Sequence, residues 1–147
     1  MGRALVRLLL DTHIWLWSLL EPKRLLPKVA TALAEPATQR WLSPLSVWET
    51  LLLIERKRLE VDRPAEPWVR EALARAPVLE APVNHEVALA SRRLKPRHRD
   101  PVDRFLIATA QMFDLTLVTE DATLLAQSGV RLLANRTARR SRKPATP

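Results

Sequence analysis

The sequence predicts an α/β fold in which a parallel sheet is covered by helices on both faces. Short apolar segments of strand length alternate along the chain with longer segments that have helical patterning. Most of the 12 prolines fall between these segments, where proline starts or ends an element. A length of 147 residues with 47% hydrophobic side chains is enough for one domain with a full core.

The expected strands are apolar runs that are too short to form a stable helix. The first run, residues 5–10, is almost entirely aliphatic and predicts a buried strand. The others are expected at residues 40–42, 78–81, 115–118 and 131–133. Because helical segments lie between consecutive strands, the strands are expected to be parallel.

The expected helices connect these strands, and proline marks the start of several. They are expected at residues 12–20, 27–34, 44–57, 68–76, 86–94, 101–113 and 122–127. Pro27, Pro44 and Pro101 each open a helix, because the fixed φ of proline suits the first helical turn. The first helix is expected to end at Glu21 and Pro22.

Composition excludes several kinds of site. The chain has no cysteine, and its three histidines lack zinc spacing, so we expect neither disulfides nor a zinc site. It has only two glycines, which excludes a glycine-rich phosphate-binding loop. Its apolar runs are shorter than the roughly 20 residues of a membrane span, and the N-terminus lacks a small-residue cleavage site for secretion. We therefore expect a cytoplasmic protein that does not enter a membrane.

Positive charge is concentrated near the C-terminus. The chain has a formal net charge of +8, and residues 134–147 contribute five basic side chains and no acidic one. We therefore interpret residues 1–133 as the folded domain and residues 134–147 as a basic, disordered tail. Such a tail either improves solubility or serves as an electrostatic arm for nucleic acid.

Several aspartates lie where each could simply begin a helix. Asp11 and Asp121 come after expected strands, and Asp100 precedes Pro101, so all three fit the N-cap position. Asp103 would then lie in the first turn of its helix, where a negative charge favours the helix dipole. Taken one at a time, these residues are better explained as caps or dipole partners than as catalysts.

Glu49 does not fit that explanation. It lies in an expected helix whose residues 44–54 are apolar on most sides, so we expect this helix to be buried. A buried carboxylate is costly unless it has a partner or takes up a proton. The partner would be Arg104, Arg40, or a metal ion shared with other acids.

Taken together, the acids predict a metal site. The carboxyl ends of parallel strands meet at one edge of a sheet, so Asp11 and Asp121 are expected there. Oxygen ligands without any cysteine select Mg²⁺ or Mn²⁺, which can activate water for attack on a phosphodiester. In a basic protein, such a site suits a polyanionic substrate. Neighbouring residues are candidate accessories, namely Thr12, Thr119, Ser46 one turn before Glu49, and Arg104 beside Asp103.

Four stretches in this order resemble the PIN-domain ribonucleases, and most closely the VapC-type toxins of toxin–antitoxin pairs. They are LLLDTH at residues 8–13, SPLSVWE at 43–49, HRDPVDRFLIATA at 98–110 and LTLVTED at 115–121. The resemblance covers about residues 5–133 and says nothing of the tail. It implies a PIN-like three-layer α/β/α sandwich whose parallel sheet has the strand order 3-2-1-4-5.

The resemblance also implies a function. Asp11, Glu49, Asp103 and Asp121 would form an acidic quartet around Mg²⁺, or around Mn²⁺, with Asp11 and Asp103 as the most direct ligands and Asp100 as an accessory. The chain would be an endoribonuclease, and its partners would be RNA, a cognate antitoxin and a second copy of itself. Two alternatives remain: a PIN-like module that binds RNA or protein without cleavage, and a metal phosphohydrolase of small molecules.

Tryptophan usage predicts one further surface feature. The chain has five tryptophans and no tyrosine. Trp15 and Trp17 cannot share one helix face, so we expect one of them to be exposed. An exposed tryptophan indicates either a surface for a protein partner or a platform on which nucleic acid bases stack.

Overall fold

The computed structural model describes residues 6–95 and 100–137, and the expected strands form one parallel sheet. The strands are β1 (Arg7–Leu10), β2 (Gln39–Leu42), β3 (Leu79–Glu80), β4 (Thr116–Thr119) and β5 (Leu132–Ala134). Their order is β3-β2-β1-β4-β5, and every neighbouring pair is parallel. This confirms the order that the family resemblance implied. Most of the predicted tail, residues 138–147, lies outside the described residues.

All the expected helices are present, with boundaries within three residues of those predicted. They are α1 (Thr12–Leu20), α2 (Pro27–Ala34), α3 (Pro44–Glu55), α4 (Ala65–Arg75), α5 (His85–Arg93), α6 (Pro101–Met112) and α7 (Ala122–Leu125). A short 3-10 helix, η1 (Pro22–Arg24), was not predicted, because Pro22 indicated only the end of a helix. None of the helices in the described ranges is long and apolar enough to cross a membrane.

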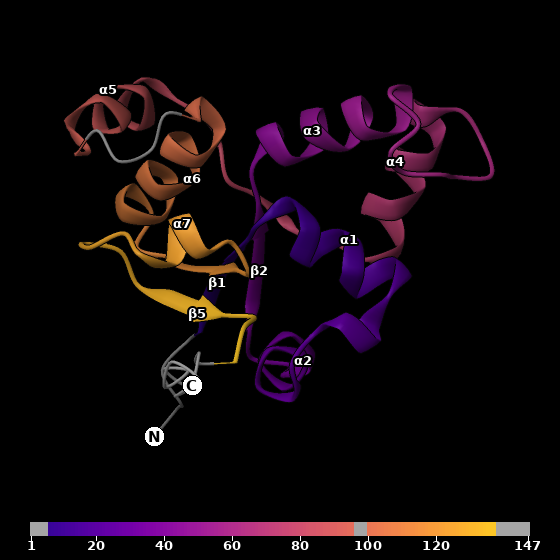
Figure 1. Ribbon diagram of the computed structural model, residues 1–147, viewed down its shortest axis with the longest axis horizontal. Coiled ribbons are helices and arrows are strands. Elements are labelled where there is room, and N and C mark those ends of the chain that lie inside the picture. Colours follow the sequence, from indigo (N-terminus) through magenta and orange to yellow (C-terminus); the bar gives the residue numbers. More distant parts are fainter. Residues whose placement is uncertain (1–5, 96–99, 138–147) are drawn as a thin grey trace, which may run out of the picture.

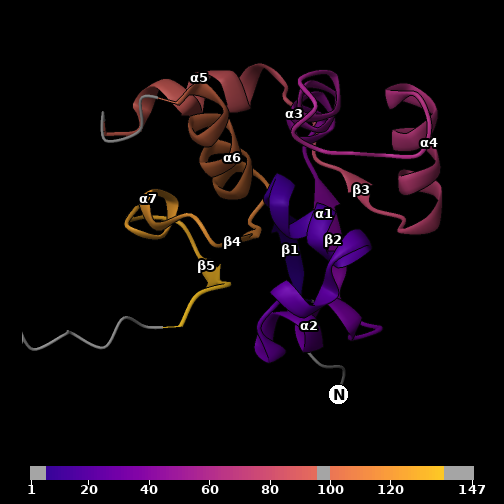
Figure 2. The same ribbon diagram turned by 45° about the vertical axis from the view of Figure 1, so that its right-hand side comes forward.

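Helices cover both faces of the sheet, which gives the domain three layers (Figure 1). Figure 2 shows α6 and α7 on one side of the strands and α4 on the other. The alternation of side chains along β1 separates the two cores. Leu8 and Leu10 pack in a cluster with residues of α1 and α2, whereas Leu9 packs with residues of α6 and α7. The α/β/α sandwich is therefore confirmed.

The central position of β1 determines where polar groups can meet. β1 pairs with β2 on one side and with β4 on the other. The chain moves outward from β1 to β2 and β3 and then returns to β4, so the strand order reverses between β1 and β4. In open α/β sheets, ligands bind beyond the carboxyl ends of the strands at such a reversal.

Helix α3 is less buried than its sequence predicts. Only Ser46 and Thr50 of this helix are buried, and Trp48 is 51% exposed. The prediction of a buried helix was wrong because α3 lies against α1 and α4, and this contact leaves much of its apolar surface uncovered. The prediction for Trp15 and Trp17 was also wrong, since both are buried in the core that α1 forms with the sheet and α2.

The folded domain extends beyond the boundary predicted at residue 133. Ala134 ends β5, and the buried Asn135 follows it. The Asn135 side chain accepts a hydrogen bond from the amide of Leu26 at 2.7 Å and donates one to the carbonyl of Arg24 at 3.0 Å. The sequence boundary missed this anchor because a polar residue after the last apolar run gives no hydrophobic signal. Asn135 fastens the end of β5 to the segment before α2.

We expect Asn135→Ala to lower the free energy of unfolding by about 2 kcal/mol, because two main-chain groups would lose their buried hydrogen-bond partner. Thr137→Ala, at an exposed position just beyond, is the control and should change stability by less than about 0.5 kcal/mol. Urea denaturation measures both values. Equal stability of the two variants would contradict the anchoring role of Asn135.

Candidate active site

Asp11 lies at the point where the strand order reverses. Its amide donates to the carbonyl of Val118 on β4 at 3.0 Å. Its Oδ2 accepts a hydrogen bond from the hydroxyl of Thr119 at 2.7 Å. Its Oδ1 accepts one from the amide of Thr12 at 2.7 Å, which makes Asp11 the N-cap of α1. Asp11 is thus both the N-cap of α1 and an acid at the edge of the sheet, as predicted.

Thr119 connects Asp11 to Asp121. While the Thr119 hydroxyl donates to Asp11, its oxygen accepts a hydrogen bond from the amide of Asp121 at 3.0 Å. Asp121 Oδ1 accepts from the amides of Thr123 and Leu124 at 2.7 and 3.3 Å, so Asp121 caps α7 as predicted. One buried hydroxyl therefore fixes the positions of two of the predicted acids relative to each other.

Glu49 approaches Asp11 and Thr12 from α3. The hydroxyl of Thr12 donates to Glu49 Oε1 at 2.7 Å. The two arginines considered as partners donate instead to main-chain carbonyls, Arg40 to Leu33 and Arg104 to Ser91. The side chain that contacts Glu49 in place of an arginine is thus a hydroxyl group. Because α3 is partly uncovered, the side chain of Glu49 is only partly buried, not fully buried as predicted.

Helix α6 brings two more aspartates to the site. Asp100 caps this helix by accepting a hydrogen bond from the amide of Val102 at 2.9 Å, and Asp103 lies in the first turn, as predicted. The charges that act on Asp103 come from Asp100, Asp121, Asp11 and Glu49. The five acids therefore lie close enough for their charges to interact. We refer to Asp11, Glu49, Asp100, Asp103 and Asp121 as the carboxylate cluster.

Repulsion within the carboxylate cluster alters the proton affinity of its members. Burial, followed by the charges of the four other acids, raises the pKa of Asp103 to about 7. Burial also raises the pKa of Asp11 and of Glu49, although hydrogen bonds from Thr119 and Thr12 partly oppose this effect. The cluster is therefore a site of closely spaced negative charge that favours binding of a cation or a proton.

The chemistry of the cluster fits a hard divalent cation. Carboxylate oxygens are the ligands that Mg²⁺ and Mn²⁺ prefer, and a bound cation would relieve the repulsion that raises the pKa of Asp103. Within residues 6–95 and 100–137, no three Asp, Glu or His side chains already lie close enough together to hold a metal ion. The threonine hydrogen bonds thus hold the acids near one another without completing a coordination shell. A cation would have to draw them closer.

Two predicted accessory residues do not contact the cluster in the predicted way. The Ser46 hydroxyl is buried and has no hydrogen-bond partner in the described part of the chain, so it does not orient Glu49. The Arg104 guanidinium donates to the carbonyls of Ser91 and Leu94 at the end of α5. These bonds tie α5 to α6 and give Arg104 a structural role.

A cavity of about 360 Å³ opens beside the cluster. Glu49 and Asp100 contribute its acidic side, and Trp48 and Leu52 contribute part of its apolar side. Sequence reasoning did not assign Trp48 to the site. Its position directly before Glu49 was the available signal, but the expectation that α3 is buried concealed it.

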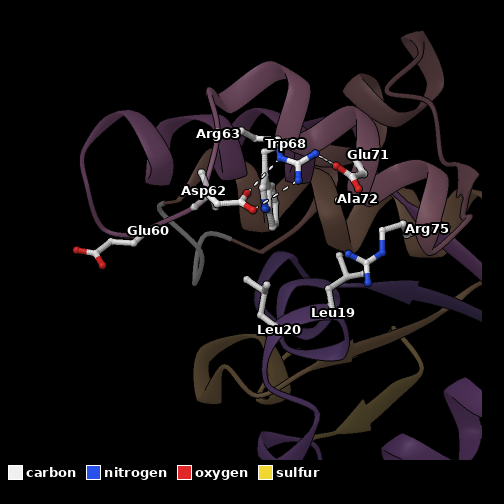
Figure 3. Close-up of a pocket in the computed structure, with 10 residues that line it drawn as sticks. Leu19, Leu20, Glu60, Asp62, Arg63, Trp68, Glu71, Ala72 and Arg75 are labelled. Atoms are coloured by element: carbon white, nitrogen blue, oxygen red, sulfur yellow. Dashed lines mark hydrogen bonds and ion pairs between the residues drawn. The ribbon is translucent and has the colours of Figure 1, made fainter.

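A second cavity, of about 280 Å³, lies at the other end of α1 (Figure 3). Leu19 and Leu20 line it from α1, and Trp68 lines it from α4. Arg63 also lines the cavity and forms an ion pair with Glu71. This cavity is separate from the carboxylate cluster and was not predicted from the sequence.

Comparison with known proteins identifies the class of protein that this fold and site define. Residues 8–128 match the family described as PIN domain, and the chain belongs to this family. Among curated proteins, the chain is similar to Ribonuclease VapC22 of Mycobacterium tuberculosis (strain ATCC 25618 / H37Rv). The two are 30% identical over 117 residues, which cover 79% of this chain and 88% of VapC22.

Solved structures share the fold at lower identity. One is VapBC2 from Rickettsia felis bound to a promoter DNA fragment, with a TM-score of 0.65 and 12% identity. Another is a toxin–antitoxin complex from Klebsiella pneumoniae, with a TM-score of 0.64 and 20% identity. Each match covers 88% of this chain and 98% of the matched chain. At these identities the comparisons confirm the fold.

The raised pKa of Asp103 predicts how stability depends on pH. The unfolded chain loses this proton near pH 3.8, whereas the folded protein keeps it up to about pH 7. The stability contributed by protonated Asp103 is therefore complete below pH 3.8 and is lost as the pH rises through about 7. Asp103→Asn stays neutral, so in EDTA we expect it to raise the Tm by about 3 °C at pH 8 and by much less at pH 4.

Asp62→Asn is the matched control, because Arg63 lowers the pKa of the exposed Asp62. This substitution should not raise the Tm at pH 8. Thermal unfolding followed by circular dichroism measures all three proteins. If Asp103→Asn were no more stable than the parent at pH 8, the proposed repulsion within the cluster would be incorrect.

Proposed function

We propose that this chain is an endoribonuclease that depends on Mg²⁺ or Mn²⁺. The carboxylate cluster carries the proposal, because its charge and its oxygen donors favour a divalent cation at the reversal of strand order. The net charge of +8 favours a polyanionic substrate. The similarity to Ribonuclease VapC22 supports RNA as that polyanion and hydrolysis as the reaction.

The acids would differ in how directly they bind a cation. Asp11 and Asp103 are the proposed direct ligands, and Glu49 and Asp121 would complete the site directly or through water molecules. A divalent cation bound there supplies a Lewis acid and lowers the pKa of a water molecule, so that no nucleophilic side chain is needed.

Two buried threonines would position the ligands. Thr119 donates its hydroxyl to Asp11 Oδ2, and Thr12 donates its hydroxyl to Glu49 Oε1. Each bond fixes the rotation of a carboxylate while leaving lone pairs on its oxygens for a cation. A hydroxyl donor fixes the acid without adding a positive charge that would compete with the metal.

The alternative is a PIN-like module that binds RNA or protein without cleavage. The presence of all four acids of the quartet argues against it, since binding alone does not require them. A metal phosphohydrolase of small molecules is less well supported, because the positive net charge favours a long polyanion.

Asp11→Asn and Asp103→Asn test the cluster, because each removes one charge with little change in shape. We expect either substitution to reduce Mg²⁺-dependent RNA cleavage by at least about 100-fold while the fold is retained. Asp62→Asn, at an exposed acid outside the cluster, should cleave like the parent. Cleavage of labelled RNA is measured with Mg²⁺, with Mn²⁺ and with EDTA.

Two results would contradict the proposal. Cluster variants that cleave as well as the parent would show that the chemistry lies elsewhere. A parent protein that binds RNA but does not cleave it with either ion would favour the binding module instead.

We also propose that the chain is the toxin of a VapBC-type pair and acts in the cytoplasm as a homodimer held by an antitoxin. The named structural neighbours are VapBC or toxin–antitoxin complexes. The cavity of Figure 3 offers a suitable anchor for an antitoxin segment, because Leu20 is 44% exposed beside Trp68 and could pack against an apolar side chain.

If a small antitoxin is encoded beside this chain's gene, we expect Leu20→Glu to weaken its binding by at least about tenfold, because a charge would enter an apolar contact. Leu89→Glu is the matched control, since Leu89 is 57% exposed on α5 and does not line this cavity. Calorimetric titration gives the affinities, and light scattering gives the number of copies of each chain. An equal effect of the two substitutions would exclude this cavity as the anchor.

A further inference from the structure

An exposed aromatic side chain beside the carboxylate cluster has no role in the proposed chemistry. Trp48 precedes Glu49 on α3 and is 51% exposed, although tryptophan is highly buried on average. It lines the cavity of about 360 Å³ to which Glu49 and Asp100 also contribute. The indole is therefore accessible to a molecule that occupies the cluster.

The other walls of this cavity are suited to a flat, uncharged group. Leu52 and Leu53 line it from α3, and Val102 lines it from α6. Its volume lies at the lower end of the range, about 300 to 1,000 Å³, of cavities that bind small molecules. An aromatic ring with aliphatic neighbours resembles the platforms on which single-stranded nucleic acids stack their bases.

Two arginines at the same cavity provide charge for phosphate. Arg56 and Arg58 line the cavity and are exposed. Among residues 6–95 and 100–137, neither guanidinium has an ion-pair or hydrogen-bond partner, so both are available. Arginine binds phosphate oxygens through its planar set of N–H donors.

We infer that this cavity is a subsite for one unpaired RNA base, which stacks on Trp48 while Arg56 and Arg58 contact the neighbouring phosphates. The inference rests on the proposed function, since a phosphodiester held at the carboxylate cluster would bring the adjacent nucleotide to the cavity. A base inside a duplex has no free face to stack on the indole. The subsite therefore requires a base that is not held in a duplex.

Continuity with the cluster favours RNA over a protein as the occupant. Glu49 belongs both to the cavity and to the proposed metal site, so an occupant must tolerate an acidic neighbour and a cation. RNA does so, because its phosphates need that cation and the two arginines. An apolar protein segment in the same place would bury Glu49 and Asp100 without an opposite charge, which is costly.

The test compares base-dependent binding with and without the indole. The probes are single-stranded oligoribonucleotides of about 10 nucleotides and abasic ribose-phosphate chains of the same length and charge. Binding is measured by fluorescence anisotropy with Mg²⁺ in an Asp11→Asn background, in which cleavage is removed. We expect the base-containing probe to bind at least about fivefold more tightly than the abasic probe.

Substitutions at Trp48 then identify the platform. Trp48→Leu keeps an apolar side chain without a ring and should reduce the preference for bases to about onefold, whereas Trp48→Phe should retain most of it. Leu89→Ala removes a comparably exposed apolar side chain on α5 and should change nothing. Arg56→Gln and Arg58→Gln should weaken both probes equally, because they remove contacts to phosphate only.

The outcomes separate this inference from the proposed function. A preference for bases that survives Trp48→Leu, or failure of both probes to bind, overturns the subsite. A change in oligomeric state on Trp48→Leu with an unchanged base preference overturns it as well and makes α3 a protein interface. If the preference depends on Trp48 but the protein with Asp11 intact never cleaves RNA, the subsite stands and the nuclease proposal fails. If the protein cleaves RNA but its base preference does not depend on Trp48, the nuclease proposal stands and the subsite fails.

Discussion

Repulsion between carboxylates at one sheet edge is the constraint on which the rest of the site depends. The hydrogen bonds that hold Asp11, Glu49 and Asp121 come from hydroxyl groups and main-chain amides. Such donors fix the position of an acid but leave its negative charge in place. An arginine in the same position would cancel that charge and remove the attraction for a cation. Burial, together with these uncancelled charges, raises the pKa of Asp103 to about 7.

The fold supports this unfavourable arrangement through its two apolar cores. β1 is buried on both faces, with Leu8 and Leu10 on one side and Leu9 on the other. A strand fixed in this way cannot move away when the acid after it is repelled. The bond from the Asp11 amide to β4 extends the pairing by one step beyond the strand. Repulsion between the carboxylates thus destabilises the site, whereas packing of the apolar cores holds its backbone in place.

The sequence predicted the elements well because hydrophobic runs and prolines are local signals, as the coincidence of α1 and α2 with their predicted ranges illustrates. It predicted the acids individually, because caps and first-turn residues are also local. The bond from Thr12 to Glu49 spans 37 positions and depends on where α3 lies, which no local pattern gives. The exposure of Trp48 was also missed, because the apolar pattern of a helix does not indicate which of its side chains a neighbouring element will cover.

The charges of the molecule would act on the proposed RNA substrate at two ranges. At long range the net charge of +8 attracts a polyanion, but close to the crevice the carboxylate cluster repels phosphate. A phosphodiester is therefore stable at the crevice only where a cation neutralises the acids. The adjacent phosphates need a different partner, and Arg56 and Arg58 lie beside the cavity of Trp48. In the proposed complex, the RNA backbone would follow the arginines and its bases would turn toward the apolar wall of α3.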